Sequence, residues 1–251
     1  MGDIARLSLT KQGEDKLYKM FGINAELLID HAWGWEPCTI ADIKSYRPQN
    51  SSISSGQVLQ RPYDYELTKL IIKEMSELLS LDLVQRGVVT NQIVLTVGYD
   101  VENIKNEDIK KDYKGEITTD NYGRKIPKHA HGTFNLGRYT ASSRLISQSA
   151  VKLFERIGNT KLLSRRINIT ANNVKYENDV AETPVYEQTD LFTDYDAKAK
   201  SDKLLEKEKR VEKVIVELKN KYGKNAILRG MNLQQGATTV ERNGQIGGHK
   251  A

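Results

Sequence analysis

The chain has 251 residues, of which 38% are hydrophobic and 28% charged, and its formal net charge is +5. This length allows one or two domains with their own cores, and the low hydrophobic share indicates additional polar, poorly ordered segments. The positive charge mildly favours a polyanionic partner. Cys38 is the only cysteine, which excludes an internal disulfide and fits a reducing cytoplasm. Without a signal peptide or a membrane-spanning apolar run, we expect a cytoplasmic protein with no membrane partner.

Residues 1–36 predict short helices that are separated by glycines, among them Gly22 and Gly34. A segment this short has too small a core to be a domain by itself. We therefore expect it to be the end of a helical domain whose beginning is missing. Residues 37–50 contain Pro37 and Pro48 and predict a linker.

Residues 51–175 predict one mixed domain of four strands and two helices. In chain order these are a strand at 51–59, a helix at 63–86, strands at 91–99 and 133–139, a helix at 141–157 and a strand at 163–174. The long connection at 100–130 predicts a hairpin through Asp120–Gly123. This order is typical of an α+β, ferredoxin-like split β-α-β sheet with both helices on one face. The other face would be free, which is common in nucleic-acid platforms, although the fold hosts many functions.

The strand at 163–174 is the strongest indication of a partner. Its sequence alternates between apolar and polar residues: Ile167, Ile169 and Ala171 against Arg166, Asn168 and Thr170. Such alternation indicates a half-buried strand whose polar side carries only positive charge. That side suits a phosphate backbone, because arginine binds phosphate oxygens and short amides and hydroxyls fill the spaces between. A merely solvated strand face is the alternative for this stretch.

Residues 176–251 are polar and predict a linker, a charged helix and a tail. We expect disorder at 176–197 and a helix at 198–222 whose apolar stripe packs on the body or on a partner. Within the linker, the apolar pair Leu191 and Phe192 has no core of its own, so Gln188–Phe192 predicts a docking peptide. The pentapeptide resembles the motif with which bacterial polymerases bind the replication sliding clamp. The predicted clamp contacts are Gln188, Asp190, Leu191 and Phe192.

The remaining candidate sites are weak. His129 and His131 lie two residues apart in an expected loop, without cysteine or carboxylate partners at ligand spacing. The glycine-rich stretch Gly244–Gly248 lacks the lysine and hydroxyl residue of a phosphate-binding loop. We therefore predict neither a metal nor a cofactor.

Several stretches together resemble the C-terminal part of Y-family translesion DNA polymerases. Ser52–Gly56, Gly132–Phe134 and Ser164–Ile167 resemble the little-finger domain, and Gly2–Leu7 resembles the end of the thumb. The ending, Gly236–Asn243 and Gln245–Ala251, is similar to the tail of the UmuC-like Gram-positive branch. The resemblance covers essentially the whole chain.

The resemblance implies a division of the chain and a set of DNA contacts. The division would be a thumb remnant at 1–36, a linker at 37–50, the little finger at 51–175 and a clamp-binding linker, charged helix and tail at 176–251. The expected DNA contacts are Ser52, Ser54, Ser55, Thr133, Asn135, Arg138, Arg165, Arg166, Asn168 and Thr170. The implied partners are primer-template DNA, the sliding clamp and a regulatory protein at the tail, in a nucleoid-associated protein of SOS damage tolerance and DNA repair.

The resemblance also shows what this chain lacks. Family catalysis depends on palm carboxylates that hold two magnesium ions, and their motif ends in a Ser-x-Asp-Glu run. No such run occurs here; the nearest match, Ser80–Leu83, lies within a predicted helix. We therefore expect no catalytic residue, no magnesium in this chain, and no polymerase activity from it alone.

Two other classes of function stay open. The first is a single-stranded RNA-binding module, which stacks bases on aromatic residues of its two central strands. In the predicted sheet these would be the first and third strands, where only Phe134 and Tyr139 are candidates. The second is a protein-interaction module in which the long helix and tail bind a partner and the basic face is unused.

Overall fold

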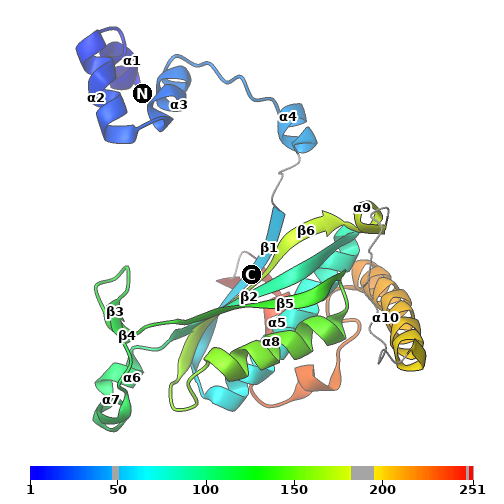
Figure 1. The fold of residues 1–251 in the computed structure, drawn as a ribbon. Helices are drawn as coiled ribbons and strands as arrows, with labels where there is room; N and C mark the ends of the chain where they lie inside the picture. Colours follow the sequence, from blue (N-terminus) through cyan, green and yellow to red (C-terminus); the bar gives the residue numbers. More distant parts are fainter. Residues whose placement is uncertain (47–50, 182–194, 247–248, 251) are drawn as a thin grey trace. The chain divides into compact units, whose positions relative to one another are not determined.

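The computed structural model describes residues 1–46, 51–181, 195–246 and 249–250. The chain forms two compact units, Met1–Gln49 and Asn50–Ala251 (Figure 1).

The first unit consists of short helices. They are α1 (Gly2–Leu7), α2 (Lys11–Phe21), α3 (Asn24–Ala32) and α4 (Ile40–Ser45). Its buried apolar residues are Ala5, Leu17 and Ala25. Helix α4 lies in the range predicted as a linker, and it begins at a capping box in which Thr39 and Asp42 bond each other's backbone. Six residues are too few to leave a clear hydrophobic period, so the sequence pattern missed this helix.

The second unit is built on a four-stranded antiparallel sheet with two long helices on one face (Figure 1). Its main elements are β1 (Ser51–Tyr63), α5 (Tyr65–Arg86), β2 (Val88–Tyr99), β5 (Ala130–Thr140), α8 (Ser143–Ile157) and β6 (Ser164–Tyr176). The predicted α+β class, with two helices on one face of a four-stranded sheet, is confirmed. Each predicted element is present, with ends that differ by a few residues.

The order of the strands across the sheet is β1-β6-β2-β5. The central strands are therefore the fourth and second of the domain, and the expectation that the first and third are central is wrong. Strand β6 enters between β1 and β2, with Ile169 opposite Ser55 on one side and Leu95 on the other. Local hydrophobic patterns carry no information on this order, because it depends on which long-range pairings bury the apolar side of each strand.

The core lies between the sheet and the layer formed by α5 and α8. Helix α5 begins at Asp64, whose carboxylate accepts a hydrogen bond from Leu67 N at 2.8 Å. Helix α8 lies close to β5 because Gly132 has no side chain there. A Cβ at Gly132 would lie 3.0 Å from both Leu153 and Ile157 of α8. This close approach completes the core around the fully buried Phe154 and its aliphatic neighbours.

The long connection between β2 and β5 is ordered. It contains α6 (Glu102–Lys105), α7 (Glu107–Asp112), β3 (Ile117–Thr119) and β4 (Lys125–Pro127). Strands β3 and β4 pair, with Thr119 opposite Lys125. The predicted hairpin through residues 120–123 is therefore present.

The described residues of the C-terminal part contain more secondary structure than the sequence predicted. Its elements are α9 (Glu177–Ala181), α10 (Tyr195–Tyr222), the 3-10 helix η1 (Gly230–Leu233), α11 (Thr239–Asn243), β7 (Gln245–Ile246) and β8 (His249–Lys250). Disorder was expected throughout 176–197, but Tyr176 ends β6, residues 177–181 form α9, and α10 begins at Tyr195.

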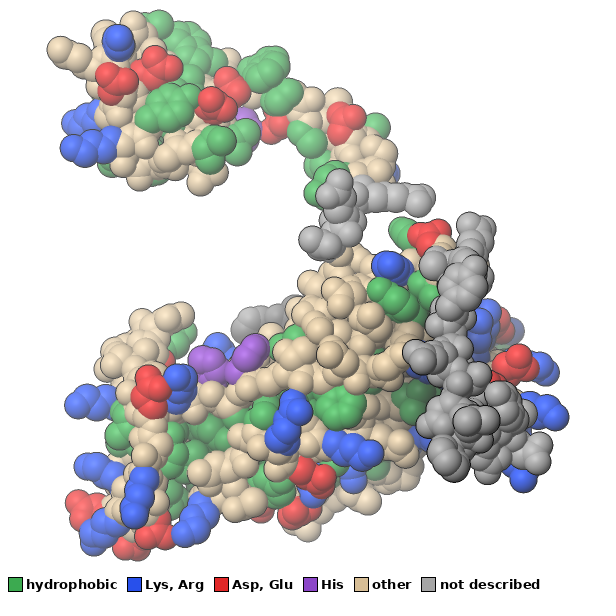
Figure 2. Space-filling model, in the orientation of Figure 1, with side chains coloured by type: hydrophobic (Ala, Val, Ile, Leu, Met, Phe, Trp, Pro, Cys, Tyr) green, Lys and Arg blue, Asp and Glu red, His purple; other side chains and the backbone are tan. Residues whose placement is uncertain are grey.

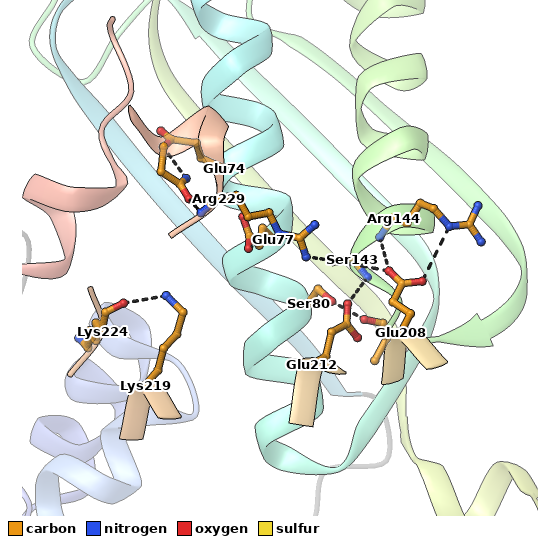
Figure 3. Close-up of polar contacts among 12 residues, drawn as sticks. Glu74, Glu77, Ser80, Ser143, Arg144, Glu208, Glu212, Lys219, Lys224 and Arg229 are labelled. Atoms are coloured by element: carbon orange, nitrogen blue, oxygen red, sulfur yellow. Dashed lines mark hydrogen bonds and ion pairs between the residues drawn. The ribbon is translucent and has the colours of Figure 1, made fainter. Parts of the chain in front are cut away.

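Helix α10 binds the helical layer through acidic side chains. Glu208 accepts hydrogen bonds from Ser142 Oγ at 2.8 Å and Arg144 N at 2.9 Å, and Glu212 accepts one from Ser143 N at 2.9 Å (Figure 3). These donors lie at the start of α8, where backbone N–H groups have no partner within the helix and the helix dipole favours negative charge. The carboxylates of α10 therefore cap α8.

The predicted apolar stripe of α10 does not make this contact. Leu204, Val211 and Tyr222 are exposed, while Glu208, which interrupts the stripe in the sequence, contacts the body. The expected packing of the stripe on the body was wrong at these positions, because the surface that α10 meets is a helix N-terminus, which binds carboxylates. Packing of the stripe on a partner stays a prediction.

Candidate nucleic-acid interface

Among the described residues no helix covers one face of the sheet, and we call this face the open face. Strand register places on it the residues that alternate with the core positions: Ser54, Gly56, Val58, Gln92, Val94, Thr96, Gly98, His131, Thr133, Asn135, Arg166, Asn168, Thr170 and Asn172. Figure 2 shows mostly uncharged atoms along these strands. The residues are small or polar, so a broad ligand can approach the backbone of the sheet closely.

The charge of this sheet has one sign. None of the strands β1, β2, β5 and β6 contains an aspartate or glutamate. Their cationic side chains are Arg61, Arg138, Arg165, Arg166 and Lys175. A sheet without carboxylates does not repel a polyanion, and its basic residues attract one.

Amide and hydroxyl groups link the strands across the open face. Asn172 donates to Gln92 at 3.2 Å, and Gln92 donates to Asn135 Oδ1 at 2.9 Å, so one row connects β6, β2 and β5. Two rows away, beyond the row of Val94 and Thr133, Thr96 Oγ1 lies 2.9 Å from His131 Nδ1. These pairs hold amide and hydroxyl groups at fixed positions between the strands, and such groups are among those that contact phosphate oxygens.

Arg166 is the exposed cation of the open face. It lies opposite Gly98 on β2 and Val58 on β1. A Cβ at Gly98 would lie 3.4 Å from the Cβ of Arg166, so the glycine leaves the space beside the arginine open. No ion pair or hydrogen bond of the Arg166 side chain is found among the described residues, which leaves its guanidinium available for a ligand.

Arg165 lies in a different environment from Arg166. Its Nη1 donates to the carbonyl of Gln60 at 3.0 Å, and its Nε lies 3.7 Å from Oδ2 of the nearly buried Asp100. We expected both arginines to contact phosphates. The structure instead places Arg165 where it connects β1 to the loop after β2, with its charge balanced by a carboxylate.

Two further predicted contacts also have partners within the protein. Arg138 forms an ion pair with Asp202 of α10 at 3.1 Å. Ser55 lies opposite the core residue Ile169, and its Oγ accepts a hydrogen bond from Arg242 at 3.0 Å. Both side chains therefore lie away from the row that contains Arg166.

The other predicted contacts are accessible from the open side. Ser52, Ser54, Thr133 and Asn135 are exposed, and Asn168 and Thr170 are partly exposed because they lie on the central strand β6. Ser54, Thr170 and Thr133 lie in one row across the sheet with Val94 of β2. The structure thus brings these residues together on one surface.

The sequence analysis missed Gln92, Thr96 and His131 as members of this surface. His131 was assigned to a loop with His129, but it belongs to β5 and points to the open side. A signal was present, because His131 continues the alternation of Thr133 and Asn135. Among the described residues there is no group of three or more histidine, cysteine or acidic side chains that could hold a metal.

A groove of about 1310 Å³ continues from the open face along the edge strand β1. Its lining includes Arg166 and Asn168 of β6 together with Lys224 and Asn243 of the C-terminal segment. The predicted clamp contacts Gln188, Asp190, Leu191 and Phe192 lie outside the described residues.

The fold and the open face define an α+β domain with a polar, carboxylate-free sheet surface. A family model described as the impB/mucB/samB family C-terminal domain matches residues 50–191. The chain belongs to this family, and it carries the C-terminal region of a Y-family translesion DNA polymerase. A comparison with curated proteins found no match. Within the described residues, none of the helices is both long and apolar enough to cross a membrane.

Proposed function

We propose that the second unit binds primer-template DNA through the open face and contacts its phosphate backbone. The observation that carries the proposal is a sheet without carboxylates whose exposed cation, Arg166, lies among small polar residues. Phosphates carry no base information, so this binding is largely independent of sequence. Ser54, Asn168, Thr170 and Thr133 supply the neutral hydrogen bonds around the arginine.

The positions of the aromatic residues do not support the alternative, a single-stranded RNA-binding module. Phe134 packs against the core, and Tyr139 lies under Lys175 Nζ, 5.1 Å from its ring centre. On the central strands, the open-face positions hold Gln92, Val94, Thr96, Gly98, Arg166, Asn168, Thr170 and Asn172, and none is aromatic. Base stacking on the sheet therefore has no platform.

The proposal includes a tether to the sliding clamp through Gln188–Phe192. Two apolar side chains next to a glutamine in a polar stretch suit a pocket on a partner, and burying each contributes about 1.5–3 kcal/mol. We further propose that the chain belongs to the UmuC-like Gram-positive branch, acts in SOS damage tolerance at the nucleoid, and offers its tail to a regulatory protein. The motif and the ending Gly236–Asn243 support this assignment.

Magnesium chemistry would belong to a palm domain. The chain contains no Ser-x-Asp-Glu run, and Ser80, part of its nearest match, is buried in α5 and bonds the carbonyl of Ala141. The proposed role of this chain is therefore to bind primer-template DNA and to attach to the sliding clamp, without catalysing DNA synthesis.

The test compares two neighbouring arginines by the salt dependence of DNA affinity. Arg166→Ala should weaken binding of every primer-template sequence alike and reduce the slope of log affinity against log salt by about 0.9, because one phosphate contact is lost. Arg165→Ala is the matched control: the same charge is removed, but from a residue that is bound to Asp100 and Gln60. An unchanged slope in Arg166→Ala, or tighter binding of single-stranded RNA than of primer-template, would refute the proposal.

A further inference from the structure

The β3–β4 hairpin stands at one end of the open face. Figure 1 shows it rising from the sheet on the side opposite α5 and α8, and Figure 2 shows it projecting beyond the end of the strands. Strand β4 is followed after two residues by β5, which contributes Thr133 and Asn135 to the open face. Lys128, between the two strands, bonds the carbonyl of Glu116 at 2.8 Å through its backbone N–H and forms an ion pair with the Glu116 carboxylate at 2.6 Å. These two contacts hold the base of the hairpin together.

Asp120 organises the tip of the hairpin. Its Oδ1 accepts hydrogen bonds from Tyr122 N and Arg124 N, both at 2.9 Å, and its Oδ2 accepts one from Arg124 Nε at 2.8 Å. Gly123 adopts a φ of +75°, which closes the turn. One carboxylate thus fixes the backbone on both sides of Tyr122, so the ring is presented on a preorganised turn.

The ring of Tyr122 is the side chain that this tip offers to a ligand. It is 81% exposed, and the Arg124 guanidinium lies 5.0 Å from the ring centre. The same guanidinium forms an ion pair with Asp120 at 2.7 Å, so its charge is balanced within the hairpin. The Arg124 interaction lowers the pKa of Asp120, which keeps this carboxylate ionised across the neutral range. What remains free is an aromatic face with a cation beside it.

We propose that Tyr122 stacks on an unpaired base where single-stranded template leaves the duplex held by the open face. Aromatic side chains bind single strands by stacking on bases, and every base has a face that can be used. A base inside a duplex has both faces covered by its neighbours, so this contact selects the single-stranded side of a junction. The inference rests on the proposed DNA binding by the open face and adds to it a site for the template strand.

The experiment measures the affinity of the full chain for a blunt duplex and for the same duplex with a single-stranded template extension. The wild-type chain should bind the extended substrate more tightly. Tyr122→Ala should weaken binding of the extended substrate about tenfold and leave the blunt duplex unchanged, since stacking of one base contributes on that order. Tyr122→Phe should retain wild-type affinity, because the ring is kept. Because the Tyr122 side chain is exposed, its removal should leave the fold intact, which circular dichroism checks.

Tyr222 provides a matched control. It is 64% exposed, and Lys221 Nζ lies 5.2 Å from its ring centre, but it belongs to α10. Tyr222→Ala should leave both affinities unchanged. A fluorescent base analogue at the first unpaired template position gives a second measurement, because stacking on Tyr122 should change its emission and Tyr122→Ala should abolish that change.

The outcomes separate the two proposals. If the blunt duplex does not bind, the proposed function of the open face fails. If the blunt duplex binds but Tyr122→Ala leaves the extended substrate unaffected, or weakens both substrates equally, the stacking site is overturned. A Tyr122 variant with normal DNA affinity but impaired binding to the sliding clamp would assign the tip to a protein partner and equally overturn the inference.

Discussion

Replacing Glu74 by alanine should release the C-terminal segment from α5. Glu74 is 1% exposed and lies inside the helical layer. Its Oε1 accepts hydrogen bonds from Asn232 Nδ2 at 2.9 Å and Thr239 N at 3.4 Å, and its Oε2 accepts from Thr238 N at 2.8 Å and Thr238 Oγ1 at 3.3 Å. One carboxylate thus serves four donors of the segment 229–243, and Figure 3 shows it beside Arg229, which binds Glu77.

The expected loss of stability in Glu74→Ala can be worked out from the two shortest of these hydrogen bonds. Each buried donor that loses its acceptor costs about 1–3 kcal/mol, so losing the partners of Asn232 Nδ2 and Thr238 N should cost about 2–6 kcal/mol. The segment can avoid most of that cost by leaving α5, because its donors then bond to water. We therefore expect local opening of residues 229–243, with the sheet and its core intact.

Hydrogen exchange read by mass spectrometry measures this opening. At the lower limit of about 2 kcal/mol, amides in 229–243 should exchange about thirtyfold faster in Glu74→Ala, while those of β2 and β6 keep their protection. Glu66→Ala is the matched control, because Glu66 lies on the same helix with its side chain 77% exposed and a 3.7 Å contact to Lys69. Unchanged exchange in 229–243 of Glu74→Ala would show that the carboxylate does not hold the segment.

Four further predictions concern other parts of the chain. Burial raises the pKa of Glu212, so the contribution of this group to stability is full at low pH and is lost as pH rises through the folded-state pKa. Glu212→Gln should therefore be more stable than wild type at pH 7. The difference between their free energies of unfolding, measured in urea, should narrow as pH falls. Gly132→Val should lower the free energy of unfolding, measured by urea denaturation, by about 1–3 kcal/mol, because the valine side chain would collide with α8. Changing Leu191 and Phe192 to alanine should abolish clamp binding in surface plasmon resonance and leave DNA affinity intact, and retained clamp binding would mean that another segment makes the contact. Primer extension with magnesium and all four nucleotides should stay at background, and any template-dependent product would contradict the expected lack of catalysis.

Much of the sheet domain could be predicted because its elements are locally encoded. The alternation of Ile167 and Ile169 with Arg166 and Asn168 indicates a strand with one buried side, and the structure has that strand in β6. Hydrophobic period and caps likewise indicated both long helices, since the spacing of buried residues follows directly from helix geometry.

The environment of each arginine could not be predicted in the same way. Arg165 and Arg166 are neighbours with identical chemistry, yet Arg165 binds Gln60 and Asp100, which are far away in the sequence. The same limit applies to Ser55, whose partner Arg242 comes from the C-terminal segment. A local pattern shows that a residue is polar, but it does not show whether a distant group already occupies its hydrogen bonds.

By itself, the sequence determined the main helices and strands of the sheet domain, the uncharged or basic character of the strands, and the family resemblance. Only the tertiary structure decided the strand order β1-β6-β2-β5 and the capping of α8 by Glu208 and Glu212. The physical reason is the range of the interactions. Helix and strand periods arise between residues a few positions apart. Strand order depends on which distant segments bury each other's apolar faces, and the capping of α8 depends on which distant carboxylates reach its unpaired backbone N–H groups.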